Sequence, residues 1–177
     1  MAYALVAGAA LAFVNIQTKP LIEENRAKVE NTARSDVLQD MAGGFEQKEA
    51  NGFAYWVGYR DAAKSEIGGY IFIARGPGYS STVETMVGVD PSGVIKGAII
   101  LFQQETPGLG AKVEEVHHGE SDPWFPRQFV GIGAADDISV VKDGGTIDAI
   151  TGATISSRAV TESIERGLDT LMSIVGG

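Results

Sequence analysis

The sequence predicts an α+β fold, with helices packed against an antiparallel sheet, preceded by an N-terminal transmembrane helix and a stalk helix. The chain opens with an almost wholly apolar run, continues with strand-like runs joined by turns, and closes with an amphipathic helical pattern. Because the strands precede the main helix instead of alternating with helices, an α+β class is favoured over a parallel α/β class. The length of 177 residues suits one domain with a short appendage.

The apolar run extends from Ala2 to Ile16 and predicts a transmembrane anchor over residues 1–18. A spanning helix needs about 20 apolar residues, and no basic segment precedes this shorter run, so we expect the start of the span to be missing. A signal peptide and a buried core helix are the alternatives. The charged, helix-favouring stretch that follows predicts a stalk helix over residues 19–42, ended by the Gly43-Gly44 pair.

Residues 43–177 are expected to form a single domain. The Asp90-Pro91-Ser92-Gly93 segment has standard turn chemistry, so residues 82–102 are predicted to form a hairpin. A short helix is expected near Ala111–His118, and apolar residues at helical spacing predict an amphipathic helix over Ser157–Val175. The predicted strands are Phe53–Tyr59, Tyr70–Ala74, Thr82–Val89, Val94–Phe102, Ile138–Val141 and Ile147–Ile150.

Composition excludes several functions. The chain has 23 acidic and 14 basic residues, and its formal charge of -9 would repel nucleic-acid phosphates, so no nucleic-acid partner is expected. No cysteine is present, which excludes disulfides, Cys-ligated iron–sulfur clusters and cysteine nucleophiles. Redox chemistry would therefore need an organic cofactor or another protein of a complex. No metal site is predicted, because the adjacent His117 and His118 would not share one helix face, and no catalytic residue is predicted.

Hydroxyl and small side chains gather where a short strand gives way to the last helix. Small residues allow a ligand to approach the backbone, and the free amides and dipole of a helix start favour a phosphate. The pattern therefore predicts an anion site, with simple helix capping by the hydroxyls as the alternative. The residues concerned are Thr151, Gly152, Ala153, Thr154, Ser156 and Ser157.

The segment Thr151-Gly152-Ala153-Thr154, preceded by Asp148 and followed by Ser156-Ser157, resembles the flavinylation motif of the FMN-binding domains in Rnf and Nqr complexes. In that family a flavin transferase moves FMN from FAD to the last threonine of the motif. The resemblance implies that FMN is attached covalently, through its phosphate, to Thr154. It also implies that Asp148 belongs to the modification motif that the transferase reads.

A second segment, Glu105-Thr106-Pro107-Gly108-Leu109-Gly110, matches an ETPGLG segment of the same family and stands upstream, as the family order requires. The resemblance implies that this loop, with cofactor-binding residues Glu105, Thr106, Gly108, Leu109 and Gly110, borders the flavin ring. Its glycines would permit close packing against a flat ring.

Two further segments are weaker candidates. The turn Gly76–Ser81 matches the family more loosely and adds Tyr79 as a candidate flavin neighbour, with an ordinary turn between strands as the alternative. Trp124 and Phe125 could flank the flavin, but packing of their own loop is the favoured interpretation.

Within the family, the chain most resembles the G subunit of the Rnf complex. The resemblance implies a membrane-anchored electron-transfer protein of a ferredoxin:NAD oxidoreductase coupled to ion translocation, not catalytic alone. Implied partners are the other membrane and redox subunits, the flavin transferase and the lipid bilayer. The resemblance implies a single-pass protein of the inner or plasma membrane, with its flavin domain on the extracytoplasmic side. The positive charges of Lys19 and Arg26 after the apolar run favour the reverse orientation. The alternatives are the C subunit of a Na+-translocating NADH:quinone reductase and a non-flavinylated, membrane-tethered binding or structural module.

Overall fold

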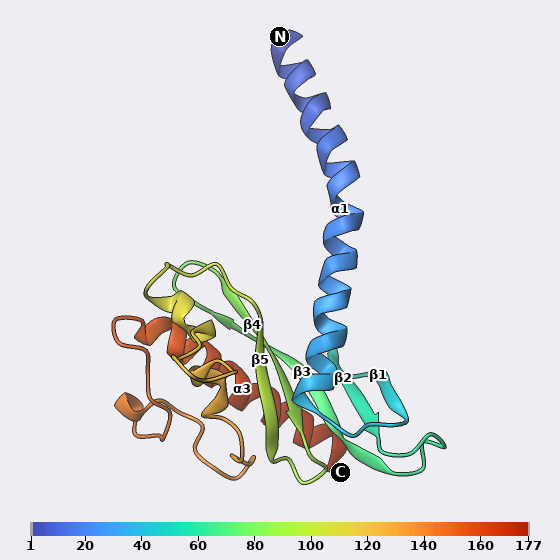
Figure 1. Cartoon of the computed structure of the whole chain (residues 1–177), viewed down its shortest axis with the longest axis vertical. Coiled ribbons are helices and arrows are strands. Elements are labelled where there is room, and N and C mark those ends of the chain that lie inside the picture. The colour runs from blue at the N-terminus through green and yellow to red at the C-terminus, as the bar shows by residue number, and fades with distance from the viewer. Residues whose placement is uncertain (1, 177) are drawn as a thin grey trace. The chain divides into compact units, whose positions relative to one another are not determined.

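A computed structural model, which describes residues 2–176, contains a five-stranded antiparallel sheet with strand order β1-β2-β3-β4-β5 and a long helix, α3, on one of its faces (Figure 1). The predicted α+β class is confirmed. The strands are β1 Gly44–Ala50, β2 Phe53–Tyr59, β3 Ile67–Pro77, β4 Thr82–Val89 and β5 Ile95–Phe102. The α-helices are α1 Ala2–Val37, α2 Trp124–Arg127 and α3 Thr154–Val175, and the short 3-10 turns are η1 Gly110–Glu114 and η2 Val141–Asp143.

The chain divides into two compact units, of which the first ends at Thr32 and the second begins at Ala33. Helix α1 runs without interruption through Pro20, and large apolar side chains such as Leu11, Phe13 and Ile16 are exposed on it. Over residues 2–176, none of the helices combines the length and the apolarity required of a membrane span. The boundaries 1–18, 19–42 and 43–177 stay predictions, and their outermost residues, 1 and 177, lie outside the described residues.

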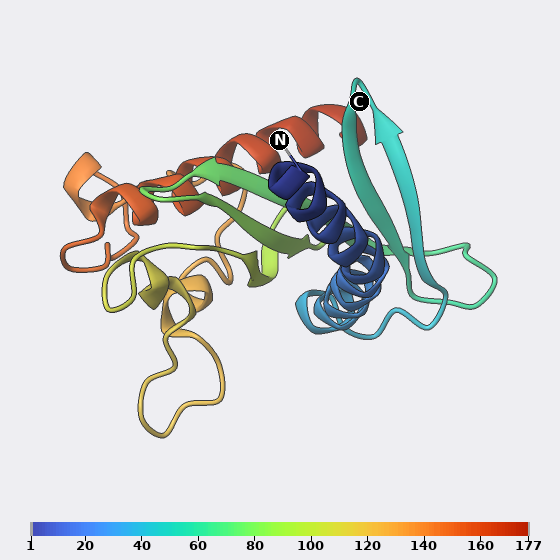
Figure 2. The same cartoon turned by 90° about the horizontal axis from the view of Figure 1, so that it is seen from above.

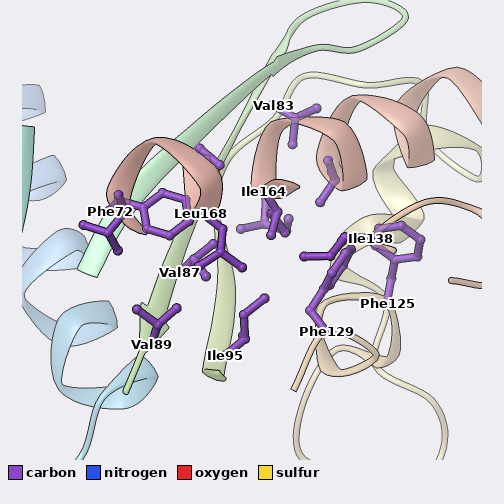
Figure 3. Packing of buried hydrophobic residues seen from close by; sticks show 14 of the residues in the cluster. Phe72, Val83, Val87, Val89, Ile95, Phe125, Phe129, Ile138, Ile164 and Leu168 are labelled. Carbon is purple, nitrogen blue, oxygen red and sulfur yellow. The ribbon is translucent and has the colours of Figure 1, made fainter. Parts of the chain in front are cut away.

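Successive side chains along a strand point to opposite faces of the sheet, and apolar side chains are buried on both faces. Phe72 and Val87 are cross-strand partners on the face that α3 covers, where Ile164 and Leu168 of the helix pack against them (Figure 3). Phe125, Phe129 and Ile138 extend this core beneath the connections between β5 and α3. Because each of these side chains is almost wholly buried, the core fixes where α3 begins.

The opposite face of the sheet holds the end of α1. Val37 and Leu38 are buried there against Trp56, Ile71 and Met86. Glycines form the floor beneath them: a Cβ at Gly88 would collide with the Val37 carbonyl oxygen, and one at Gly97 would lie 2.8 Å from the Val37 Cα. The backbone of α1 can approach the sheet closely because hydrogen is the only side chain at these positions.

Several elements differ from the expectations. Strand β1 was not predicted, because its exposed, largely polar edge lacks apolar alternation. The strands predicted at Ile138–Val141 and Ile147–Ile150 are wrong: this region has one parallel bridge, between Val140 and Ile147, and its apolar residues reflect burial in the core. The helix predicted at Ala111–His118 is the shorter 3-10 turn η1. Helix α3 begins at Thr154, earlier than predicted, so its first turn includes Thr154, Ser156 and Ser157.

The predicted hairpin between β4 and β5 is confirmed, and Asp90 stabilises its turn. The Oδ1 atom of Asp90 accepts hydrogen bonds from the amide of Ser92 at 3.0 Å, its hydroxyl at 2.6 Å and the amide of Val94 at 3.1 Å. Lys96 lies 2.9 Å from Oδ2. Burial opposes ionisation, but the bonds to Ser92, Lys96 and Val94 outweigh it and lower the pKa of Asp90 to about 2.

Asp90→Asn is expected to lower the free energy of unfolding by about 1–2 kcal/mol at pH 7. Because the folded-state pKa lies below the unfolded value of 3.8, this contribution is complete above about pH 5 and is lost as the pH falls through about 2. Urea unfolding of both proteins between pH 7 and pH 2 measures it. A difference that stays constant across this range would contradict the assignment.

Candidate functional site

Three segments that are distant in sequence meet at the start of α3. They are the turn between β3 and β4, the loop after β5, and the residues leading into the helix, and both cartoon views place the start of α3 beside the β3–β4 turn (Figures 1 and 2). Together with η2 they enclose a pocket of about 490 Å³. Its walls are formed by Tyr79, Glu105, Thr106, Leu109, Gly110, Lys142, Gly152, Ala153, Thr154, Ile155 and Ser156.

Glu105 connects these three segments. Its Oε1 accepts hydrogen bonds from the Ser80 amide at 3.0 Å, the Ser81 amide at 2.9 Å and the Ser81 hydroxyl at 3.0 Å. Its Oε2 accepts from the Tyr79 amide at 3.0 Å and from the Ser156 hydroxyl at 2.6 Å. The side chain thereby joins the β3–β4 turn to the first turn of α3.

The Glu105 carboxylate is ionised in this setting. The residue is only 6% exposed, and burial by itself would raise its pKa. The hydrogen bonds from Ser156, Ser80, Tyr79 and Ser81 outweigh burial and hold the pKa of Glu105 below its ordinary value. Because both oxygens are occupied by these donors, Glu105 shapes the pocket and adds a negative charge to its wall.

The hydroxyls at the start of α3 have separate roles, and none of them caps the helix. The N-cap residue is Ala153, which makes no side-chain capping hydrogen bond. Ser157 is fully buried, donates to the Ala153 carbonyl at 3.0 Å and accepts from the Ile150 amide at 2.9 Å, which fixes the entry of the chain into the helix. The amides of the first turn have no partner within the helix, so they can bind an anion.

Gly152 turns the chain into the pocket. Its φ of +80° lies in the left-handed region that glycine adopts without strain, and a Cβ there would lie 3.1 Å from Leu109. The left-handed φ is therefore the main reason for glycine at this position, and the small residue also leaves room for the Leu109 side chain.

Lys142 is a pocket residue that sequence reasoning missed. It lies on η2, and its Nζ donates a hydrogen bond to the Thr154 hydroxyl oxygen at 3.0 Å. The neighbouring Asp143 forms a bidentate pair with Arg158 of α3, with both N–O distances at 2.6 Å. The hydrogen bond from Arg158 lowers the pKa of Asp143. The sequence does hold one signal: Lys142 is the only Lys or Arg between Arg127 and Arg158.

Most predicted cofactor residues lie on the pocket wall. Those brought together are Tyr79, Glu105, Thr106, Leu109, Gly110, Gly152, Ala153, Thr154 and Ser156. Four of the predicted residues lie outside the pocket wall: Gly108, Asp148, Thr151 and Ser157. Ile155 lies on the wall and is not among the predicted residues.

Residues outside the wall have identifiable roles. The side chain of Asp148 is exposed, while its backbone is held by Gln128, through bonds of 2.8 Å to its amide and 3.2 Å to its carbonyl. Phe125 is buried in the core, and Trp124 stacks on His117 with ring centroids 5.4 Å apart. These two aromatic side chains therefore serve packing.

Fold and site together define a class of protein: an antiparallel α+β domain with a pocket at the start of its last helix. The family model described as the FMN-binding domain matches residues 78–169, a range that contains every residue of the pocket wall. The chain belongs to the FMN-binding domain family. This membership supports FMN as the cofactor.

Similar proteins agree with this assignment. The chain is 33% identical to the G subunit of the Na(+)-translocating ferredoxin:NAD(+) oxidoreductase complex of Acetobacterium woodii, over 96% of this chain and 86% of that protein. It is 30% identical to the G subunit of the proton-translocating ferredoxin:NAD(+) oxidoreductase complex of Clostridium ljungdahlii, over 97% and 88%. The crystal structure of Shewanella oneidensis NqrC matches with a TM-score of 0.54 and 22% identity, covering 76% of this chain and 70% of that one, and shows the same fold. The resemblance identified from the two motifs is confirmed.

Proposed function

We propose that this chain is the electron-transfer protein of an Rnf-type, ion-translocating ferredoxin:NAD oxidoreductase complex, and that it carries FMN joined through its phosphate to Thr154. The full-length similarity to two G subunits supports the complex, and the FMN-binding domain supports the cofactor. The observation that carries the attachment point is the Thr154 hydroxyl, at the first residue of α3 and in contact with the Lys142 ammonium inside the pocket.

The residues present fit such a cofactor. The Thr154 oxygen, the Lys142 ammonium and the amides of the first helical turn would hold the phosphate. Three apolar or aromatic residues of the wall offer surface for a flat ring. They are Tyr79, which is 73% exposed, Leu109, which is 44% exposed, and Ile155, which is 50% exposed. When bound, FMN accepts and donates single electrons, and the protein supplies its binding and orientation.

The proposal includes a membrane tether. The run Ala2–Ile16 is apolar in sequence, it lies in a continuous helix, and its described large side chains, including Leu11, Phe13 and Ile16, are exposed. A helix with apolar residues exposed in this way is suited to a lipid or protein environment. By analogy with the family, we place the flavin domain on the extracytoplasmic side of the cell membrane, in contact with other proteins of the complex.

Maturation would require a flavin transferase. The exposed side chain of Asp148 lies in the segment leading to Thr154, and Gln128 holds its backbone. This arrangement supports a role for Asp148 in recognition by the transferase and not in the flavin pocket.

The test is made on protein purified from its own membrane. We expect flavin absorbance that survives denaturation, and a peptide containing Thr154 that carries an FMN phosphoester in mass spectrometry. Protein without flavin would instead favour the alternative of a tethered binding or structural module. The C subunit of a Na+-translocating NADH:quinone reductase is the second candidate, because the Thr151–Thr154 motif resembles the domains of both complexes. Reduction of the purified complex by NADH with quinone as acceptor, without ferredoxin, would favour it.

A further inference from the structure

The ammonium group of Lys142 has an unusual partner for a lysine of this chain. Its hydrogen bond is to a hydroxyl oxygen, that of Thr154, at 3.0 Å. Other lysines form ion pairs with carboxylates, as Lys19, Lys28, Lys64, Lys96 and Lys112 do. An ammonium that contacts a neutral hydroxyl retains its full charge for an anion that arrives beside it.

The backbone that carries Lys142 is fixed to α3. The bidentate pair between Asp143 and Arg158 joins η2 to the helix one turn after Thr154, and the amide of Val141 donates to the Ile147 carbonyl at 2.9 Å. Since the Asp143 carboxylate is occupied by the guanidinium of Arg158, the nearest acidic neighbour of Lys142 in sequence is already neutralised. These bonds hold η2 beside the start of α3, where the Lys142 ammonium reaches the Thr154 hydroxyl.

The charges around the pocket favour a cation beside a phosphate attached to Thr154. The ionised carboxylate of Glu105 accepts from the Ser156 hydroxyl at 2.6 Å, two residues beyond Thr154. A phosphate on Thr154 would thus meet a fixed negative charge in a chain of net charge -9. The start of α3 offsets this with roughly half an elementary charge, and Lys142 supplies a full one.

We propose that Lys142 is the positioning residue for flavin attachment: it orients the Thr154 hydroxyl for attack and then neutralises the phosphodiester that results. In the step, the Thr154 oxygen forms a bond to the FMN phosphorus of FAD, and the bond from that phosphorus to the AMP oxygen breaks. AMP leaves with the electron pair of that bond, and the hydroxyl proton passes to a base of the transferase. Lys142 keeps its own proton throughout. This inference rests on the proposed function.

The experiment uses the full chain, isolated without flavin, with purified flavin transferase and FAD. The rate of FMN addition to the Thr154 peptide is followed by mass spectrometry for wild type, Lys142→Met, Lys142→Arg and the control Lys112→Met. We expect Lys142→Met to lower the maximal rate at least tenfold with little change in the KM for the acceptor chain. Lys142→Arg should recover most of the rate, because it restores the charge, and Lys112→Met should match wild type.

The possible outcomes separate this inference from the proposed function. If Lys142→Met is modified at the wild-type rate, the role of Lys142 is excluded while covalent attachment stands. A raised KM with an unchanged maximal rate would mean that the transferase merely recognises Lys142, which also overturns the proposal. If the wild-type chain itself stays unmodified, the proposed function fails, and this inference fails with it. Equal melting temperatures of the variants verify that each is folded.

Discussion

Thr154→Ala is expected to abolish covalent flavin while leaving the domain folded. The Thr154 oxygen is the proposed attachment point, and it accepts a hydrogen bond from Lys142. Thr154 is the first residue of α3 and is only half-buried, and alanine is a good helix former, so the substitution removes no core contact. Intact mass and flavin fluorescence after denaturation measure the loss, and the melting temperature reports the fold.

Two companion variants sharpen this result. Thr170→Ala removes an exposed hydroxyl from the same helix, one that donates to the Arg166 carbonyl, and should keep the full flavin content. Thr154→Ser retains a hydroxyl at the same position and should be modified, at a reduced rate. If the Thr154→Ala protein still carries the mass of FMN, attached to another residue, the assignment of the attachment point is wrong.

Glu105→Gln is expected to lower the free energy of unfolding by about 2–4 kcal/mol and to loosen the pocket. The carboxylate accepts five hydrogen bonds from the turn at residues 79–81 and from Ser156. In the glutamine variant an NH2 group replaces one of the acceptor oxygens, so buried donors face another donor. Urea unfolding measures the loss, and Glu66→Gln, which changes an exposed glutamate, is the matched control with a small expected effect.

The effect of Glu105 should depend on pH in a defined direction. Because its folded-state pKa is depressed, its stabilising contribution is complete above the ordinary glutamate pKa and is lost as the pH falls through the folded value. Wild type and Glu105→Gln should therefore converge in acid. If their difference is the same at pH 7 and in acid, the ionised state of Glu105 does not contribute.

The sequence predicts those parts of the molecule in which the signal is local. The predicted bounds of Phe53–Tyr59 and Thr82–Val89 equal those of β2 and β4, because apolar residues and turn residues delimit both strands. Strand β1 has no such pattern, since its position depends on pairing with β2 and not on its own burial.

The same distinction holds for the site. The two motifs identify residues of the loop after β5 and of the start of α3, which the fold brings onto one pocket wall. The roles of Glu105 and Lys142 could not be predicted from the sequence. Glu105 bonds to Ser156, 51 positions away, and Lys142 bonds to Thr154, 12 positions away, and no rule of sequence spacing predicts either contact. For the same reason the sequence does not distinguish Ser157 from the adjacent Ser156. The Ser157 hydroxyl bonds to the backbone before the helix, whereas Ser156 lies on the pocket wall.

The packing of the end of α1 against the sheet has a practical consequence for any shortened form of the flavin domain. A shortened protein that starts at Gly43 would lack Val37 and Leu38 and would uncover Trp56, Ile71 and Met86, which these residues shield. A bare apolar patch of this kind promotes self-association in solution. Expression of the isolated domain for crystallisation or electrochemistry should therefore start at Ala33 or earlier, so that the sheet keeps its own cover.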